Sequence, residues 1–195
     1  MDSIIRDPNT GNGAHVLLDS VTNKGLLRTY GVIEGESRYV NEYHQESYSL
    51  VLDNITPAAG GDCFCFIQNL KDQRMMIESI LLKKFTADDE VAVVLGATGT
   101  RDTVTDIVPG NKWAGSANLA EGIFEEGADL AGGAATLTQA SGVNIDIINL
   151  IFGQESKLWK WESALIIPKN QTLSLWAGTG GDAFNTTINF YYHMF

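Results

Sequence analysis

Large apolar side chains occupy alternate positions along much of this chain. In residues 47–53 they occupy every second position, and in Asn185–Tyr192 the same spacing is kept by Ile188, Phe190 and Tyr192. A period of two places alternate side chains on one face of an extended strand. Each segment is therefore predicted to be a strand that buries one side.

The C-terminal third contains three such apolar segments. They are Ala164–Ile167, Thr172–Trp176 and Asn185–Tyr192, and they are separated by Pro168–Asn170 and by Gly178–Asp182. Both separators consist of residues that favour turns. The pattern predicts a β-meander.

Further apolar runs occur along the rest of the chain. Met75–Phe85 fits a helical face as well as a strand, but its β-branched residues and its length favour a strand. The other predicted strands are His15–Asp19, Leu26–Ile33, Asp62–Ile67, Glu90–Leu95, Thr103–Val108, Val143–Phe152 and Lys157–Ile167.

About ten to twelve short strands separated by Gly-rich turns predict an all-β, antiparallel two-sheet β-sandwich, and the jelly-roll form fits best. The predicted sandwich domain covers residues 47–195. Residues 1–46 form an N-terminal extended arm and a connector. Within this part, Met1–Gly13 is predicted to be an arm that is either flexible or ordered by a partner. Glu34–Glu46 is predicted to be a charged connector that could contain one helical turn. The Gly- and Ala-rich segment Asn111–Gly142 is predicted to form long loops outside the core.

Composition limits the partners that the chain can have. The 195 residues are 44% hydrophobic and 19% charged, which is typical of a folded domain. The formal net charge of −11 works against nucleic acid or an anionic membrane surface as the main partner. No secretion signal or membrane span is visible in the sequence, so we expect no membrane association.

The sequence contains few residues suited to catalysis or metal binding. Cys63 and Cys65 are predicted to lie on the same face of a strand as small buried hydrophobes, too far apart for a disulfide. His15, His44 and His193 have no metal-ligand spacing. We therefore expect no enzyme and no cofactor.

Acidic clusters occur at Asp88–Glu90, at Asp102 with Asp106, and at Glu121 with Glu125 and Glu126. Carboxylates in loops bind calcium in some proteins, and paired carboxylates hydrolyse glycosides in others. None of these clusters has the spacing of an EF-hand loop. They are interpreted as solvated faces.

Trp159 and Trp161 fall on one face of a predicted strand. Such a pair is suited to the core, to a subunit interface or to stacking on sugar rings, and core or interface is favoured. The predicted partner-binding residues are Trp159 and Trp161, together with Ile4, Ile5 and Arg6 of the arm.

The arrangement of the chain resembles a group of tailed-bacteriophage virion proteins. The points of similarity are the polar arm, the segments Asn23–Val32, Phe64–Leu70 and Met76–Ile80, and a C-terminal part in which Ala164–Pro168 is followed by a final strand. It is a likeness of pattern over most of the chain.

The resemblance implies a jelly-roll structural protein of the virion, most simply a capsid decoration or accessory protein. Its expected partners are other virion proteins, either the major capsid protein or a tail protein, together with further copies of itself as a trimer. It would fold in the host bacterial cytoplasm and then join the particle. The alternative is a tail-associated host-adhesion or carbohydrate-binding module.

Overall fold

The computed structural model describes residues 3–6, 13–18, 25–26, 40–84, 88–151 and 156–193. The chain divides into two compact units, Met1–Gly35 and Glu36–Phe195. Several predictions extend beyond the described residues: most of the Leu26–Ile33 strand, much of the arm, and the strand ends at Phe85 and Phe152.

The first unit contains a three-stranded sheet. Its strands are β1 (Ser3–Arg6), β2 (Gly13–Leu18) and β3 (Gly25–Leu26), and both neighbouring pairs are antiparallel. Ser3–Arg6 of the predicted arm is therefore an extended strand whose backbone pairs with β2.

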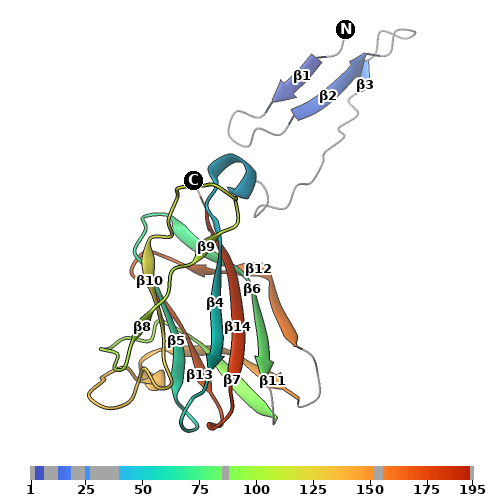
Figure 1. Ribbon diagram of the computed structural model, residues 1–195. Coiled ribbons are helices and arrows are strands. Elements are labelled where there is room, and N and C mark those ends of the chain that lie inside the picture. Colours follow the sequence, from blue (N-terminus) through green and yellow to red (C-terminus); the bar gives the residue numbers. More distant parts are fainter. Residues whose placement is uncertain are drawn as a thin grey trace. The chain divides into compact units, whose positions relative to one another are not determined.

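The second unit is a sandwich of two antiparallel sheets, and this confirms the predicted fold class (Figure 1). The five-stranded sheet has the order β12 (Lys157–Ile167), β6 (Arg74–Lys84), β14 (Phe184–His193), β4 (Ser47–Ile55) and β9 (Gly110–Asn111). The six-stranded sheet has the order β11 (Val143–Leu150), β7 (Asp89–Leu95), β13 (Thr172–Ala177), β5 (Cys63–Asn69), β10 (Gly122–Glu126) and β8 (Thr105–Asp106).

The eight longer strands are connected as a jelly roll. From β4 to β7 the chain alternates between the two sheets, and from β11 to β14 it alternates back. Each strand of the first set pairs with one of the second: β4 with β14, β5 with β13, β6 with β12 and β7 with β11. This pairing of one set of four strands with the other is the jelly-roll topology that the sequence predicts.

The predicted C-terminal β-meander is wrong. β12, β13 and β14 exist as strands, but β12 and β14 belong to the five-stranded sheet and β13 to the six-stranded one. Each of the two turns therefore carries the chain across the sandwich. Period-two alternation identifies the buried face of a strand but not the sheet that it joins.

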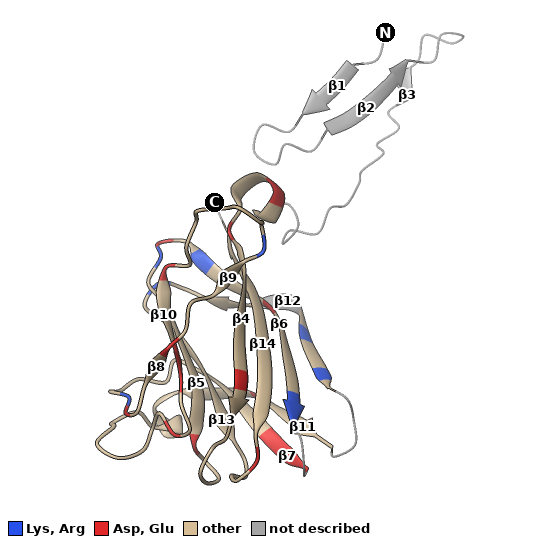
Figure 2. Cartoon of the chain, viewed as in Figure 1, with Lys and Arg blue, Asp and Glu red and all other residues tan. Residues whose placement is uncertain are grey.

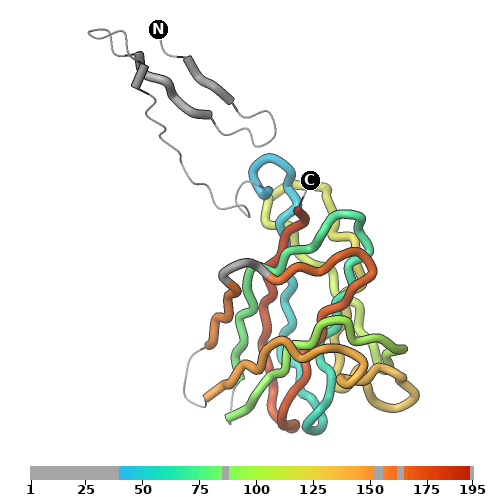
Figure 3. The backbone as a smooth tube through the Cα atoms, turned by 180° about the vertical axis from the view of Figure 1, so that it is seen from behind, coloured from blue at the N-terminus to red at the C-terminus, as the bar shows by residue number. Residues whose placement is uncertain are grey.

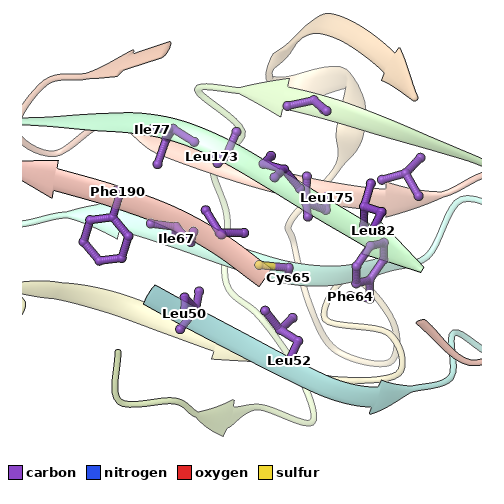
Figure 4. Packing of buried hydrophobic residues seen from close by; sticks show 14 of the residues in the cluster. Leu50, Leu52, Phe64, Cys65, Ile67, Ile77, Leu82, Leu173, Leu175 and Phe190 are labelled. Atoms are coloured by element: carbon purple, nitrogen blue, oxygen red, sulfur yellow. The ribbon is translucent and has the colours of Figure 1, made fainter. Parts of the chain in front are cut away.

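The main core lies between the two sheets, where apolar side chains from both point toward each other (Figure 4). Phe64 of β5 stacks on Phe184 of β14 with ring centroids 5.0 Å apart, and Tyr48 stacks on Phe190 at 5.4 Å. These four side chains are fully buried. Removing one such aromatic ring costs about 3–5 kcal/mol.

Residues 96–142, between β7 and β11, form an insertion in the jelly roll that runs from lime green to orange in Figure 3. The insertion contributes β8, β9 and β10 to the edges of the two sheets, and Phe124 of β10 joins the main core. The predicted strand Thr103–Val108 is reduced to the two residues of β8. The prediction that Asn111–Gly142 lies outside the core is also wrong, because this segment buries apolar side chains.

Two further predictions are confirmed. The Met75–Phe85 segment is a strand as far as it is described, since β6 ends at Lys84. The connector contains one helical turn, Val40–His44, in which Val40 packs on Met76 and Tyr191. In the described part of the chain, no helix has the length and apolar character to cross a membrane.

The cysteine prediction is partly wrong. Both cysteines are free and buried, as expected. They do not share a face, because the register of β13 against β5 shifts between Leu175 and Trp176. Cys65 therefore points into the main core, whereas Cys63 packs in a second cluster.

Candidate functional site

The insertion covers an apolar cluster on the outer face of the six-stranded sheet. Phe66, Val94 and Trp176 of the sheet are buried there by Leu130 and Leu137 of the insertion. None of the five side chains is more than 3% exposed. This face is part of the folded interior.

An ion pair within the insertion lies against the same face. The Arg101 guanidinium donates to both carboxylate oxygens of Glu125, at 2.6 and 2.9 Å, and lies 4.4 Å from the centroid of the Phe66 ring. The bond to Glu125 raises the pKa of Arg101. Gly99 (φ +140°) lets the chain pass close by, because a Cβ there would lie 2.4 Å from the Leu137 nitrogen.

The outer face of the five-stranded sheet is different, because a row of side chains crosses it in register. Leu158 of β12 pairs with Leu81 of β6, Leu81 with Thr187 of β14, and Thr187 with Val51 of β4. Leu158 is 51% exposed and Val51 is 56% exposed. In a monomer, this row leaves apolar surface in water.

Two lysines flank the row at its β12 end. Lys160 follows Leu158 by two positions on β12, Lys83 follows Leu81 by two positions on β6, and both are exposed. We name these four residues the β6–β12 patch. Figure 2 shows the basic residues on these two strands, in contrast to the acidic residues on β7.

A second exposed apolar surface lies on the edge strand of the six-stranded sheet. Val143, Ile145 and Ile147 of β11 are 67%, 37% and 46% exposed, and we name them the β11 edge. A bulge interrupts the pairing of β11 with β7 between Asn144 and Asp146. Bulges and inward-pointing charges are common on edge strands, where they hinder uncontrolled strand addition.

The β11 edge has an acidic surround. Exposed Glu90 of β7 is paired with Asn149 of β11, whereas the Asp146 side chain faces the inner side of the sandwich, where it accepts from Trp159. The strands β5, β7, β8, β10, β11 and β13 contain no Lys or Arg. Lysines of the other sheet reach this region, since Lys157 Nζ donates to the Asn149 carbonyl at 2.9 Å and Lys84 pairs with Asp89 of β7.

The predicted tryptophan pair lies on the inner side of β12. Trp159 and Trp161 are partly buried and pack against the main core. The Trp159 indole Nε1–H donates to Asp146 Oδ2 at 2.7 Å, and Lys157 Nζ lies 5.3 Å from the Trp159 ring centroid. This position favours a core role over a solvent-facing platform for sugar rings.

The other predicted partner-binding residues, Ile4, Ile5 and Arg6, lie in β1 of the first unit. Their backbones pair with His15, Ala14 and Gly13 of β2, respectively. They belong to a different compact unit from Trp159 and Trp161.

The interpretation of the acidic clusters as solvated faces is wrong for two carboxylates. Asp89 is buried in an ion pair with Lys84, at 2.6 Å, with side-chain exposures of 0% and 3%. It also accepts from the Thr179 amide at 2.8 Å. Glu125 is buried against Arg101. Asp88, Glu90 and Asp106 are exposed, as predicted.

A further polar cluster fixes the connector to the sandwich. Lys71 Nζ pairs with Glu46 Oε1 at 2.5 Å and lies 4.7 Å from the centroid of the Tyr192 ring. Burial, with a contribution from the Glu46 charge, raises the pKa of Tyr48 to about 12. The cluster is explained by its structural role.

The residues that sequence reasoning missed are Leu81, Leu158 and Lys83. The alternation that places Trp159 and Trp161 on one face of β12 also places Leu158 on the other. Its pairing with Leu81 depends on a strand about 80 positions away, and this pairing could not be read from the sequence.

Among the described residues, no group of three or more His, Cys, Asp or Glu side chains is arranged to hold a metal ion. Comparison with protein-family models, curated proteins and solved structures found no match. The exposed surfaces of the sandwich are therefore the features from which a function can be inferred.

Proposed function

We propose that this chain is a structural component of a bacteriophage virion, a capsid decoration or accessory protein that works through protein–protein contacts. The observation that carries the proposal is the uncovered row Leu158–Leu81–Thr187–Val51 on the outer face of a jelly-roll sheet. Exposed apolar surface with a charged border is typical of protein interaction sites.

Two further features support this proposal. The chain resembles phage virion proteins in pattern, and a jelly roll is a fold that viral shell proteins use. It also has a separate N-terminal unit, which is suited to contact a second partner. In this proposal Ile4, Ile5 and Arg6 attach the protein to the major capsid or tail protein, and the sandwich contacts other copies.

The proposal is tested by co-sedimentation of the full chain with phage particles from which it has been stripped. The native chain is expected to sediment with the particles. Arg6→Glu and Ile5→Asp variants are expected to remain in the supernatant while keeping the native thermal transition. If the native chain does not bind particles, the proposal is overturned. If the variants bind like the native chain, only the proposed role of β1 is overturned.

A further inference from the structure

We propose that the β6–β12 patch of one copy binds the β11 edge of a second copy of this chain, so that copies join head to tail in a small closed ring. This inference rests on the proposed function, in which the sandwich contacts other copies. It identifies the two surfaces that meet when one copy binds the next.

The apolar parts of the two surfaces are suited to each other. Leu158 is 51% exposed on the patch, and Ile147 is 46% exposed on the β11 edge. Leu81 lies beside Leu158 in the paired strand and widens the patch. Joining the two surfaces would remove both from water, which is the main favourable term in association.

The charges of the two surfaces are complementary. Lys83 and Lys160 border the patch, whereas exposed Glu90 of β7 lies beside the β11 edge and pairs with Asn149 of that strand. If a patch met a second patch, lysines would face lysines, and if two β11 edges met, carboxylates would face carboxylates. The attractive combination is therefore patch to edge.

The two surfaces lie on different parts of the sandwich. The patch is on an outer face of the sandwich, and the β11 edge is on the rim of the other sheet (Figure 1). A contact between these two different surfaces is heterologous, because the patch of one copy meets the β11 edge of the next. A heterologous contact makes a ring when the rotation from copy to copy closes, and the expected trimer is such a ring.

The test uses the full chain and two variants that each damage one surface. Leu158→Asp damages the patch, and Ile147→Asp damages the β11 edge. Val108→Asp is the matched control, because Val108 is 79% exposed and lies in the insertion outside both surfaces. Mass is measured by light scattering after gel filtration, and folding is checked by the thermal transition.

The native chain and Val108→Asp are expected to form a discrete oligomer, and three copies are the expected number. Each damaging variant alone is expected to weaken association by at least about tenfold. Mixing the two is expected to give a one-to-one complex, because each variant keeps the surface that the other lacks. A mixture that stays monomeric, or a native chain that is monomeric at high concentration, overturns the inference.

Charge reversal tests the same contact if an aspartate prevents folding. Lys83→Glu with Lys160→Glu is expected to lower association, and adding Glu90→Lys is expected to restore part of it. If association is unchanged by the reversals, the inference is overturned. A monomeric native chain that still sediments with particles overturns the ring and leaves the proposed function standing. A ring that does not bind particles overturns the proposed function and leaves the inference of a ring standing.

Discussion

The two outer faces of the sandwich differ in how their apolar residues are shielded from water. On the six-stranded sheet, the insertion covers Trp176 and Phe66, and their exposures fall to 3% and 2%. On the five-stranded sheet, Leu158 and Val51 keep about half of their surface exposed. The same kind of residue is therefore a core residue on one face and a surface residue on the other.

This difference separates structural residues from candidate interaction residues. A covered residue contributes to the free energy of unfolding, and its removal leaves a cavity. An exposed residue contributes little to folding and is available to a partner. Substitutions on the two faces should therefore have opposite effects on stability and assembly.

The largest expected effect is on the covered face. Trp176→Ala should lower the free energy of unfolding by about 3–5 kcal/mol, because it empties the cluster under the insertion. The matched change on the other face, Leu158→Ala, should change it by less than about 0.5 kcal/mol. Urea denaturation followed by circular dichroism measures both. Equal losses of unfolding free energy would show that Leu158 is as much a part of the folded core as Trp176.

The ion pair within the insertion, between Arg101 and Glu125, is expected to have the next largest effect. Arg101→Met should cost about 2 kcal/mol, because Glu125 would keep a buried charge without its partner. Replacing Glu125 by Gln in the same chain should recover part of the loss. A double-mutant cycle that shows no coupling between the two positions would contradict this account of the insertion.

A smaller, pH-dependent effect is expected at Glu126 of β10. Burial, together with the charge of Asp53, raises the pKa of this carboxyl. The folded chain therefore holds the proton to a higher pH than the unfolded chain, and stability falls as pH rises through that window. Glu126→Gln should raise stability at pH 7 by less than about 1 kcal/mol and leave it unchanged at pH 3. If Glu126→Gln instead lowered stability at pH 7, the charged form of Glu126 would be stabilised by its surroundings in the folded chain.

The smallest expected signal is the reactivity of the native thiols. Cys63 and Cys65 are both fully buried, and burial raises the pKa of each thiol. A thiol reagent at pH 8 should therefore leave both unmodified in the native protein and label both in urea. Rapid labelling of native Cys63 would indicate that the insertion opens readily from its face.

The sequence predicted the character of individual strands better than their arrangement. Tyr48, Leu50 and Leu52 are buried on one face of β4, as the alternation indicates. The pairing of β4 with β14 joins Asn54 and Asn185, which are 131 positions apart, and no local pattern specifies such a contact. For the same reason, the crossing of β13 to the other sheet was missed.

The candidate surfaces were harder to predict than the fold. Leu158 and Leu81 form one patch only because β12 and β6 pair in this register. Leu130 and Leu137 lie in a Gly- and Ala-rich segment with no periodic pattern, so their role in covering the sheet was not visible. In both cases the missing information is the tertiary contact and not the residue type.

The central claim is that copies of this protein bind one another through the uncovered face of the five-stranded sheet. Concentration-dependent labelling of a single introduced cysteine, Leu158→Cys, tests it most directly, since the native thiols are buried. The account predicts that labelling slows as protein concentration rises, whereas labelling of Val108→Cys stays constant. Equal labelling rates at Leu158→Cys across all concentrations would contradict it.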